Sequence, residues 1–126
     1  MDPTDRRYTE EHEWVKLDGD LAVVGITDFA QDQLGDVVYV ELPKVGDRVE
    51  AMKSFGVIES VKTASDLFAP VSGTVEEVNA TLTSGPEAVN EAPYEGGWLI
   101  KVKPDNPTDI DSLMTAQQYA DQVAGS

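Results

Sequence analysis

Short runs of apolar and β-branched residues, separated by turn signals, recur along the first hundred residues. Such runs are typical of strands. The apolar run at 21–26 follows the turn signal Asp18-Gly19-Asp20, so it predicts a hairpin with the preceding segment 8–17. Further strands are predicted at 36–42 and 98–103. The pattern therefore indicates a chain rich in strands.

The segment that follows the first hairpin carries the signals of a short helix. Thr27 suits the N-cap, and Asp28 places an acidic residue in the first turn. Gly35 suits the position past the end. The inner face of this helix would carry Phe29, Ala30 and Leu34.

The last third of the chain is less regular. Residues 80–86 contain a turn, and 86–90 predict one helical turn with proline in its first position. After residue 108, apolar residues at near-helical spacing predict two short helices, the second capped by Thr115. These apolar residues are Ile110, Leu113, Met114, Tyr119 and Val123.

The central stretch 55–70 predicts two short strands that meet at Val61-Lys62 and end at Ala69-Pro70. Lys62 would then lie at the tip of a hairpin, where a modifying enzyme could reach its amine. Val-Lys is not a preferred two-residue turn, so one longer strand with an exposed lysine is the alternative. The hairpin interpretation favours a carrier over a catalyst.

A short internal repeat flanks this stretch. Leu42-Pro43-Lys44-Val45-Gly46 is echoed by Ala69-Pro70-Val71-Ser72-Gly73, and each leads into a segment that contains valine. A proline three residues before a glycine marks a turn that feeds a strand. The repeat predicts two similar half-sheets with the Lys62 hairpin near the axis between them.

The composition bounds the function. The chain has 126 residues, 40% of them hydrophobic and 26% charged, which fits one domain with a single core. It has no apolar run long enough to cross a bilayer, and residues 1–7 resemble neither a secretory signal nor a transit peptide. We therefore expect a cytoplasmic protein, from a bacterium.

The formal net charge of −15 argues against partners that are nucleic acids or anionic membranes. It suits partners with basic faces, although acidity can also serve only to keep a small protein soluble. The chain has no cysteine, so disulfides, thiolate metal sites and cysteine nucleophiles are excluded. His12 is the only histidine, and no glycine-rich phosphate loop follows a strand. An enzyme interpretation has no set of residues to support it.

Two segments carry a family resemblance. Glu59-Ser60-Val61-Lys62-Thr63-Ala64-Ser65-Asp66, followed by Ala69-Pro70-Val71-Ser72-Gly73, resembles the lipoyl-attachment segment of the H proteins of the glycine cleavage system. The resemblance covers nearly the whole chain and departs at Ala51-Met52 and Thr63. Further matches in the same order are His12-Glu13-Trp14, Val24-Gly25-Ile26-Thr27-Asp28, Ala30-Gln31, Leu34-Gly35-Asp36-Val37-Val38, Pro93-Tyr94, Gly97-Trp98 and Ile100-Lys101.

A second lysine resembles a different carrier class. Glu50-Ala51-Met52-Lys53 is similar to the Ala-Met-Lys core of biotin carriers, but Ser54 stands where that motif has methionine. In both carrier classes a glycine lies eleven residues past the modified lysine. The residue eleven positions past Lys62 is Gly73, whereas the residue eleven positions past Lys53 is Ala64. We therefore expect Lys53 to be an exposed residue near a loop.

The resemblance implies a mainly β fold: a lipoyl-domain-like sandwich, or flattened barrel, of two small antiparallel sheets with short flanking helices and a C-terminal helix. Residues 1–126 would form a single lipoyl-carrier domain, with its core at about 8–103 and a helical segment at about 108–124. We expect a monomer.

The resemblance also implies a function. Lipoate would join the Lys62 amine as an amide and form a mobile arm, and the chain itself would not be a catalyst. In the family, the arm collects an aminomethyl group at a pyridoxal-phosphate glycine decarboxylase and delivers it to a tetrahydrofolate aminomethyltransferase. Dihydrolipoamide dehydrogenase then reoxidises the dithiol with NAD. A lipoate-attaching enzyme is the fourth implied partner.

Residue matching suggests further site residues. Glu13 and Asp66 are candidates to hold the ammonium of the loaded arm in a surface cleft, or they are solvated acids beside strands. Glu59, with Asp66, would help a lipoate-attaching enzyme to recognise the hairpin, or would shield a sheet edge. His12 and Trp14 are assigned to packing around the first hairpin, and Trp98 to the core.

Two alternative functions stay open. The chain could be a lipoyl relay that serves other lipoylated enzymes, or an acidic interaction domain in which Lys62 is never modified. The lipoylation state of Lys62 separates the second alternative from both carrier functions.

Overall fold

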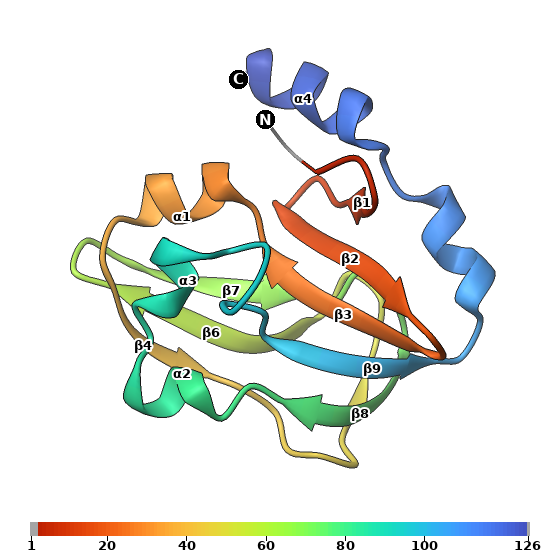
Figure 1. The fold of residues 1–126 in the computed structure, drawn as a ribbon, viewed down its shortest axis with the longest axis horizontal. Helices are drawn as coiled ribbons and strands as arrows, with labels where there is room; N and C mark the ends of the chain where they lie inside the picture. The colour runs from red at the N-terminus through yellow and green to blue at the C-terminus, as the bar shows by residue number, and fades with distance from the viewer. Residues whose placement is uncertain (1–2, 126) are drawn as a thin grey trace.

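The computed structural model describes residues 3–125, which form two antiparallel sheets (Figure 1). Within these residues the larger sheet has six strands, in the order β1 (Arg7–Tyr8), β2 (Glu13–Asp18), β3 (Leu21–Ile26), β9 (Ile100–Pro104), β8 (Gly73–Val78) and β5 (Arg48–Val49). The smaller sheet has three strands, in the order β4 (Val37–Glu41), β6 (Ser54–Ser60) and β7 (Ala64–Phe68).

The core lies between the two sheets. The larger sheet contributes buried residues such as Val24 and Ile100, and the smaller sheet contributes Ile58 and Leu67. Because successive side chains of a strand point to opposite faces, each sheet can bury one face and expose the other. The predicted sandwich of two antiparallel sheets is therefore confirmed, and the sheets do not close into a barrel.

The N-terminal hairpin forms as the sequence pattern predicts, with Asp18 paired to Leu21 across the turn. The closing strand starts at Ile100, two residues later than predicted. Trp98 is half-buried: it packs against the edge of a buried aromatic cluster, and the Lys101 ammonium lies 4.9 Å from its ring centroid.

The prediction of two half-sheets from the internal repeat is wrong. The strands that follow the two repeat units, β5 and β8, pair with each other in one sheet, with Val49 opposite Gly73. On the other side of β8, Gly73 permits the close approach of β9, because a β-carbon there would collide with the Lys103 carbonyl oxygen. Backbone pairing, rather than similarity of sequence, decides which sheet a strand joins.

Short helices flank the sheets: α1 (Asp28–Leu34), α2 (Thr81–Ser84), α3 (Ala88–Glu91), a 3-10 helix at Pro107–Ser112 and α4 (Ala116–Ala124). The predicted caps are confirmed, since the Thr27 side chain accepts a hydrogen bond from the Ala30 amide and Thr115 forms a capping box with Gln118. The segment predicted as a turn at 80–86 contains α2. No helix within residues 3–125 is long and apolar enough to cross a membrane.

The C-terminal helix α4 packs beside β1 in a small second cluster of buried residues. This cluster contains Tyr8, Trp14 and Tyr119. The rings of Tyr8 and Tyr119 are stacked, with centroids 4.9 Å apart. This contact places α4 above the start of β2, on the same side of the molecule as α1 (Figure 1).

Candidate functional site

The Lys62 hairpin is present. Strands β6 and β7 pair from Ser54–Phe68 to Glu59–Ala64, and residues 61–63 join them as an exposed loop. Lys62 lies in the middle of this loop, as the hairpin interpretation predicts. The alternative of one longer strand is therefore wrong.

The side chain of Ser60 explains a tight turn without glycine. Its hydroxyl oxygen accepts hydrogen bonds from the amides of Lys62 and Thr63, both at 3.2 Å. The Ser60 amide donates to the Thr63 carbonyl at 2.8 Å. A serine side chain can thus satisfy turn amides that a favourable turn sequence would otherwise satisfy.

The side chain of Lys62 runs toward the end of helix α1. A β-carbon at position 35 would lie 3.2 Å from Lys62 Cε and 3.7 Å from its Nζ. Gly35 has a φ of +77°, which favours glycine at the end of a helix. Among residues 3–125, no carboxylate lies within ion-pair distance of the Lys62 amine.

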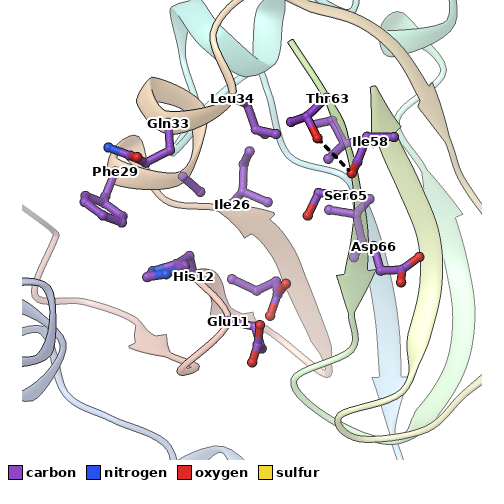
Figure 2. A pocket seen from close by; sticks show the side chains of 14 residues that line it. Glu11, His12, Ile26, Phe29, Gln33, Leu34, Ile58, Thr63, Ser65 and Asp66 are labelled. Atoms are coloured by element: carbon purple, nitrogen blue, oxygen red, sulfur yellow. Dashed lines mark hydrogen bonds between the residues drawn. The ribbon is translucent and has the colours of Figure 1, made fainter. Parts of the chain in front are cut away.

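A cleft of about 390 Å³ lies between α1 and β7, and we call it the α1–β7 cleft. Figure 2 shows Phe29 and Gln33 on one side, Thr63 and Ser65 on the opposite side, and His12 along a third side. The complete lining is Glu11, His12, Glu13, Ile26, Phe29, Ala30, Gln33, Leu34, Ile58, Thr63, Ala64, Ser65, Asp66 and Leu67. Because Lys62 precedes the wall residue Thr63, the cleft begins beside the hairpin tip.

Glu13 is the buried acid of this cleft, with only 2% of its surface exposed. The Thr9 hydroxyl donates to Glu13 Oε1 at 2.7 Å, and the Phe68 amide donates to Oε2 at 3.2 Å. Burial raises the pKa of Glu13 to about 7, since desolvation of the charge outweighs these two hydrogen bonds. The side chain can therefore exist as acid or carboxylate near neutral pH.

Asp66 also lines this cleft but is exposed. Its neighbour Leu67 faces the core, so strand alternation directs the Asp66 side chain to the other face of β7. Figure 2 shows the Asp66 carboxylate on the side of β7 away from Phe29. The structure thus places Glu13, on β2, and Asp66, on β7, in the lining of one cleft, and only Glu13 is buried.

Glu59 is exposed on β6, opposite Tyr39 of β4 and Ala64 of β7. It lies three residues before Lys62 and does not line the α1–β7 cleft. Lys53 is exposed and forms an ion pair with Glu50 at 3.0 Å, near the loop where the sequence places it. Residues 3–125 contain no cluster of acidic residues and histidine that could hold a metal ion.

Two cleft-related residues have no clear signal in the sequence. Thr9 fixes Glu13, and Tyr119 contacts the cleft residue His12, with its hydroxyl 2.8 Å from His12 Nδ1. His12 has a structural role, as predicted, and its ring packs 4.9 Å from that of Phe29. Thr9 could have been suspected from its proximity to Glu13 in sequence, but Tyr119 is 107 residues from His12.

Comparison with known proteins gives the family. The family model described as glycine cleavage H-protein matches residues 6–125. The glycine cleavage system H protein of Bacillus licheniformis is 56% identical over 121 residues, covering 96% of this chain and 95% of the relative. The H protein of Anaeromyxobacter sp. (strain K) is 60% identical over 117 residues, covering 93% of this chain and 91% of the relative.

A solved structure agrees with these sequence matches. The crystal structure of a glycine cleavage system H protein from Mycobacterium marinum has a TM-score of 0.90 and 43% sequence identity, covering 97% of this chain and 98% of that one. Sequence and fold point to the same conclusion. This chain belongs to the glycine cleavage H-protein family, whose members are non-catalytic lipoyl carriers of the glycine cleavage system.

Proposed function

We propose that Lys62 carries the lipoyl group of this chain as an amide on its side-chain amine. The observation that carries the proposal is the position of Lys62 at the exposed tip of a tight hairpin, next to a cleft that starts at Thr63. An amine held away from carboxylates within residues 3–125 is accessible to a modifying enzyme. Lys53 is a poorer candidate because the Glu50 carboxylate pairs with its amine at 3.0 Å.

The α1–β7 cleft fits such an arm. An extended lipoyl-lysine reaches roughly 14 Å, as ordinary bond lengths require. The apolar side chains of Phe29, Leu34 and Ile58 suit its hydrocarbon chain, and the buried Glu13 carboxyl suits an ammonium. When bound, the group supplies a dithiolane that accepts the aminomethyl unit and two electrons. The residues of the cleft would hold this arm and keep water from it between visits to the enzymes.

Glu13 and Asp66 are the proposed acids of the cleft. A cationic ammonium near Glu13 would favour its carboxylate form and counteract the burial that raises its pKa to about 7. Asp66 lies at the surface of the β7 side of the cleft and would contribute after its side chain turns toward the cleft. We assign the main contact to Glu13, because a buried carboxylate attracts a cation more strongly than an exposed one.

We further propose the partners of the arm: glycine decarboxylase, aminomethyltransferase, dihydrolipoamide dehydrogenase and a lipoate-attaching enzyme. The net charge of −15 supports docking on basic surfaces. The exposed Glu59, on the strand that leads to Lys62, is proposed to help the attaching enzyme recognise the hairpin. The chain would work as a monomeric single domain in the bacterial cytoplasm, and the relatives named above are bacterial.

The test is site-specific modification. The purified protein, Lys62→Arg and the matched control Lys53→Arg are treated with lipoate ligase and lipoate, then analysed by intact mass and peptide mapping. We expect one lipoyl increment on the Lys62 peptide, lost only in Lys62→Arg, because arginine keeps the charge but cannot form the amide. Modification at Lys53, or none while a control lipoyl domain is modified, would overturn the proposal.

Glycine cleavage provides the functional readout. With the three other components of the system supplied, Lys62→Arg should give no turnover above background, and Lys53→Arg should match the unsubstituted protein. Turnover by Lys62→Arg would contradict the assignment even if the mass analysis supported it.

A further inference from the structure

The hydroxyl group of Tyr119 connects three elements that are distant in sequence. Tyr119 is fully buried on the C-terminal helix α4. Its hydroxyl lies 2.8 Å from His12 Nδ1 and 2.7 Å from Thr27 Oγ1, residues separated from it by 107 and 92 positions. One phenol therefore joins α4, the loop before β2 and the start of α1.

Both partners of this hydroxyl support the α1–β7 cleft. Thr27 caps α1 through the Ala30 amide at 3.2 Å, and its own amide donates to the His12 carbonyl at 3.0 Å. His12 lines the cleft and packs against Phe29, another lining residue, at 4.9 Å between ring centroids. The position of the His12 ring therefore affects two sides of the cleft, its own side and the side that Phe29 forms.

The directions of the hydrogen bonds are mutually consistent. Burial lowers the pKa of His12, so the ring is neutral at pH 7 and Nδ1 can accept from the Tyr119 hydroxyl. The Thr27 hydroxyl can then donate to the Tyr119 oxygen while Thr27 Oγ1 accepts from Ala30. With these directions, His12 carries its proton on Nε2.

His12 also needs support from its surroundings, because its φ of +73° lies in the left-handed region. That conformation is costly for residues other than glycine and persists only where other contacts hold it. Tyr119 provides such a contact, because its ring lies edge-on to the imidazole with the two ring centroids 5.7 Å apart.

We propose that Tyr119 is a positioning residue for the lipoyl arm: its hydroxyl holds His12 and the start of α1 where they close the α1–β7 cleft around the arm. The inference rests on the proposed attachment at Lys62 and on the cleft as the resting place of the arm. It assigns the C-terminal helix a role in sheltering a group that is attached to the opposite end of the cleft.

A single-atom change isolates this role. Tyr119→Phe removes the hydroxyl but keeps the ring stacked on Tyr8, and the Thr115 capping box still starts α4. Tyr8→Phe is the matched control, because it changes the other ring of the same stack and loses a hydrogen bond to the Pro3 carbonyl, and neither Tyr8 nor Pro3 lines the cleft. A general loosening of α4 would affect both variants, whereas the proposed role affects only Tyr119→Phe.

The main readout is the alkylation rate of the reduced lipoyl dithiol by iodoacetamide, with free dihydrolipoamide as the unsheltered reference. The unsubstituted protein should react more slowly than the reference. Tyr119→Phe loses the contacts of the hydroxyl with both His12 and Thr27 and should react roughly two- to tenfold faster than the unsubstituted protein, a factor of the order that a single hydrogen bond supplies. Tyr8→Phe should react at the unsubstituted rate. Equal rates for Tyr119→Phe and the unsubstituted protein would overturn the inference.

Nuclear magnetic resonance of the unlipoylated protein gives a second readout. The chain has one histidine, so the ring nitrogen signals of His12 are unambiguous. We expect the Nε2-protonated tautomer in the unsubstituted protein and a shifted Nδ1 signal in Tyr119→Phe only. An Nδ1-protonated ring in the unsubstituted protein would contradict the proposed role.

A third variant tests the inference if Tyr119→Phe does not fold. His12→Asn breaks the same contact from the other side, and asparagine tolerates positive φ better than most residues. It should also speed alkylation, and an unchanged rate would overturn the inference. A different result would show that the proposed attachment or the sheltering cleft is wrong. In that case Lys62 would stay unmodified, or the unsubstituted protein would already react as fast as free dihydrolipoamide.

Discussion

The side chain of Lys62 lies over Gly35, the residue that ends helix α1: a β-carbon at position 35 would come within 3.2 Å of Lys62 Cε. Two features of the structure favour glycine at position 35. Its φ of +77° is unfavourable for other residues, and the absence of a side chain leaves a passage for the lysine stem beside the cleft. This relationship connects the end of a helix with the direction of the proposed arm.

Gly35→Ala should therefore cost stability and displace the lysine. We expect the free energy of unfolding to fall by about 1–2 kcal/mol, because alanine is strained at positive φ. The flexible lysine stem should move away from the new methyl group and speed alkylation of the reduced dithiol. Urea unfolding and the alkylation assay measure the two effects.

Gly46→Ala is the control for Gly35→Ala. Gly46 also has positive φ, at +96°, but a β-carbon there meets nothing within 4 Å. It should lose comparable stability without a change in alkylation rate. If both variants altered the rate equally, contact between residues 35 and 62 would not be the cause.

Ser60→Ala should weaken the presentation of Lys62. The hydroxyl oxygen accepts from the Lys62 and Thr63 amides, so its removal releases the loop at a cost of roughly 0.5–1 kcal/mol. We expect kcat/KM for lipoylation to fall several-fold, because the enzyme must then order a mobile loop. Ser54→Ala, at the other end of β6, should lipoylate normally, and a normal rate for Ser60→Ala would refute this role of the hydroxyl.

Glu13 should make stability depend on pH. Its pKa is about 7 in the folded protein against 4.5 in the unfolded chain, so the folded state binds more protons between these values. The free energy of unfolding should fall as pH rises from 4.5 to 7, by roughly 3 kcal/mol from this group. Glu13→Gln cannot titrate, so the variant should lack this fall.

Urea unfolding at pH 5 and pH 8 measures the effect of Glu13. The difference between Glu13→Gln and the unsubstituted protein isolates it from His12, whose lowered pKa contributes stability that is lost as pH falls. Glu10→Gln, an exposed neighbour, is the control and should keep the unsubstituted pH dependence. The same dependence in Glu13→Gln would rule out Glu13 as its source.

Gly25→Ala should disturb the packing of Trp14. The two residues are paired across β2 and β3, and a β-carbon at position 25 would lie 2.5 Å from the Trp14 ring. The ring is buried and donates to the Pro93 carbonyl at 3.0 Å, so it has little freedom to move. We expect a loss of about 1–3 kcal/mol, measured by urea unfolding. Gly96→Ala, where a β-carbon meets nothing within 4 Å, should stay within about 0.5 kcal/mol.

Local elements of this fold could be predicted because their signals lie within a few residues of one another. The turn at 18–20 and the caps Thr27 and Thr115 depend on adjacent side chains and amides, and they are confirmed. The turn sequence of the Lys62 hairpin does not favour a hairpin, and the prediction depends on the resemblance to the H proteins. In the structure, the Ser60 side chain supplies the hydrogen bonds that the turn sequence lacks.

Pairings between distant segments could not be read in this way. The pairing of β5 with β8 and the half-buried position of Trp98 depend on which surfaces the whole chain buries. The candidate site shows the same difference. Lys62 could be identified from the order of residues in the motif 59–66, whereas the orientation of Asp66 depends on how β7 faces the core.

The first hairpin, the caps at Thr27 and Thr115, the exposed lysine and the family could be predicted, since each depends on neighbouring residues or on their order. Packing of the whole chain buries Glu13 near Thr9 and Phe68, places Lys62 over Gly35 and brings Tyr119 to His12. Apart from the contact of Thr9 with Glu13, these contacts join residues that are distant along the chain. Desolvation and contacts between remote residues arise only when the sheets and helices pack together.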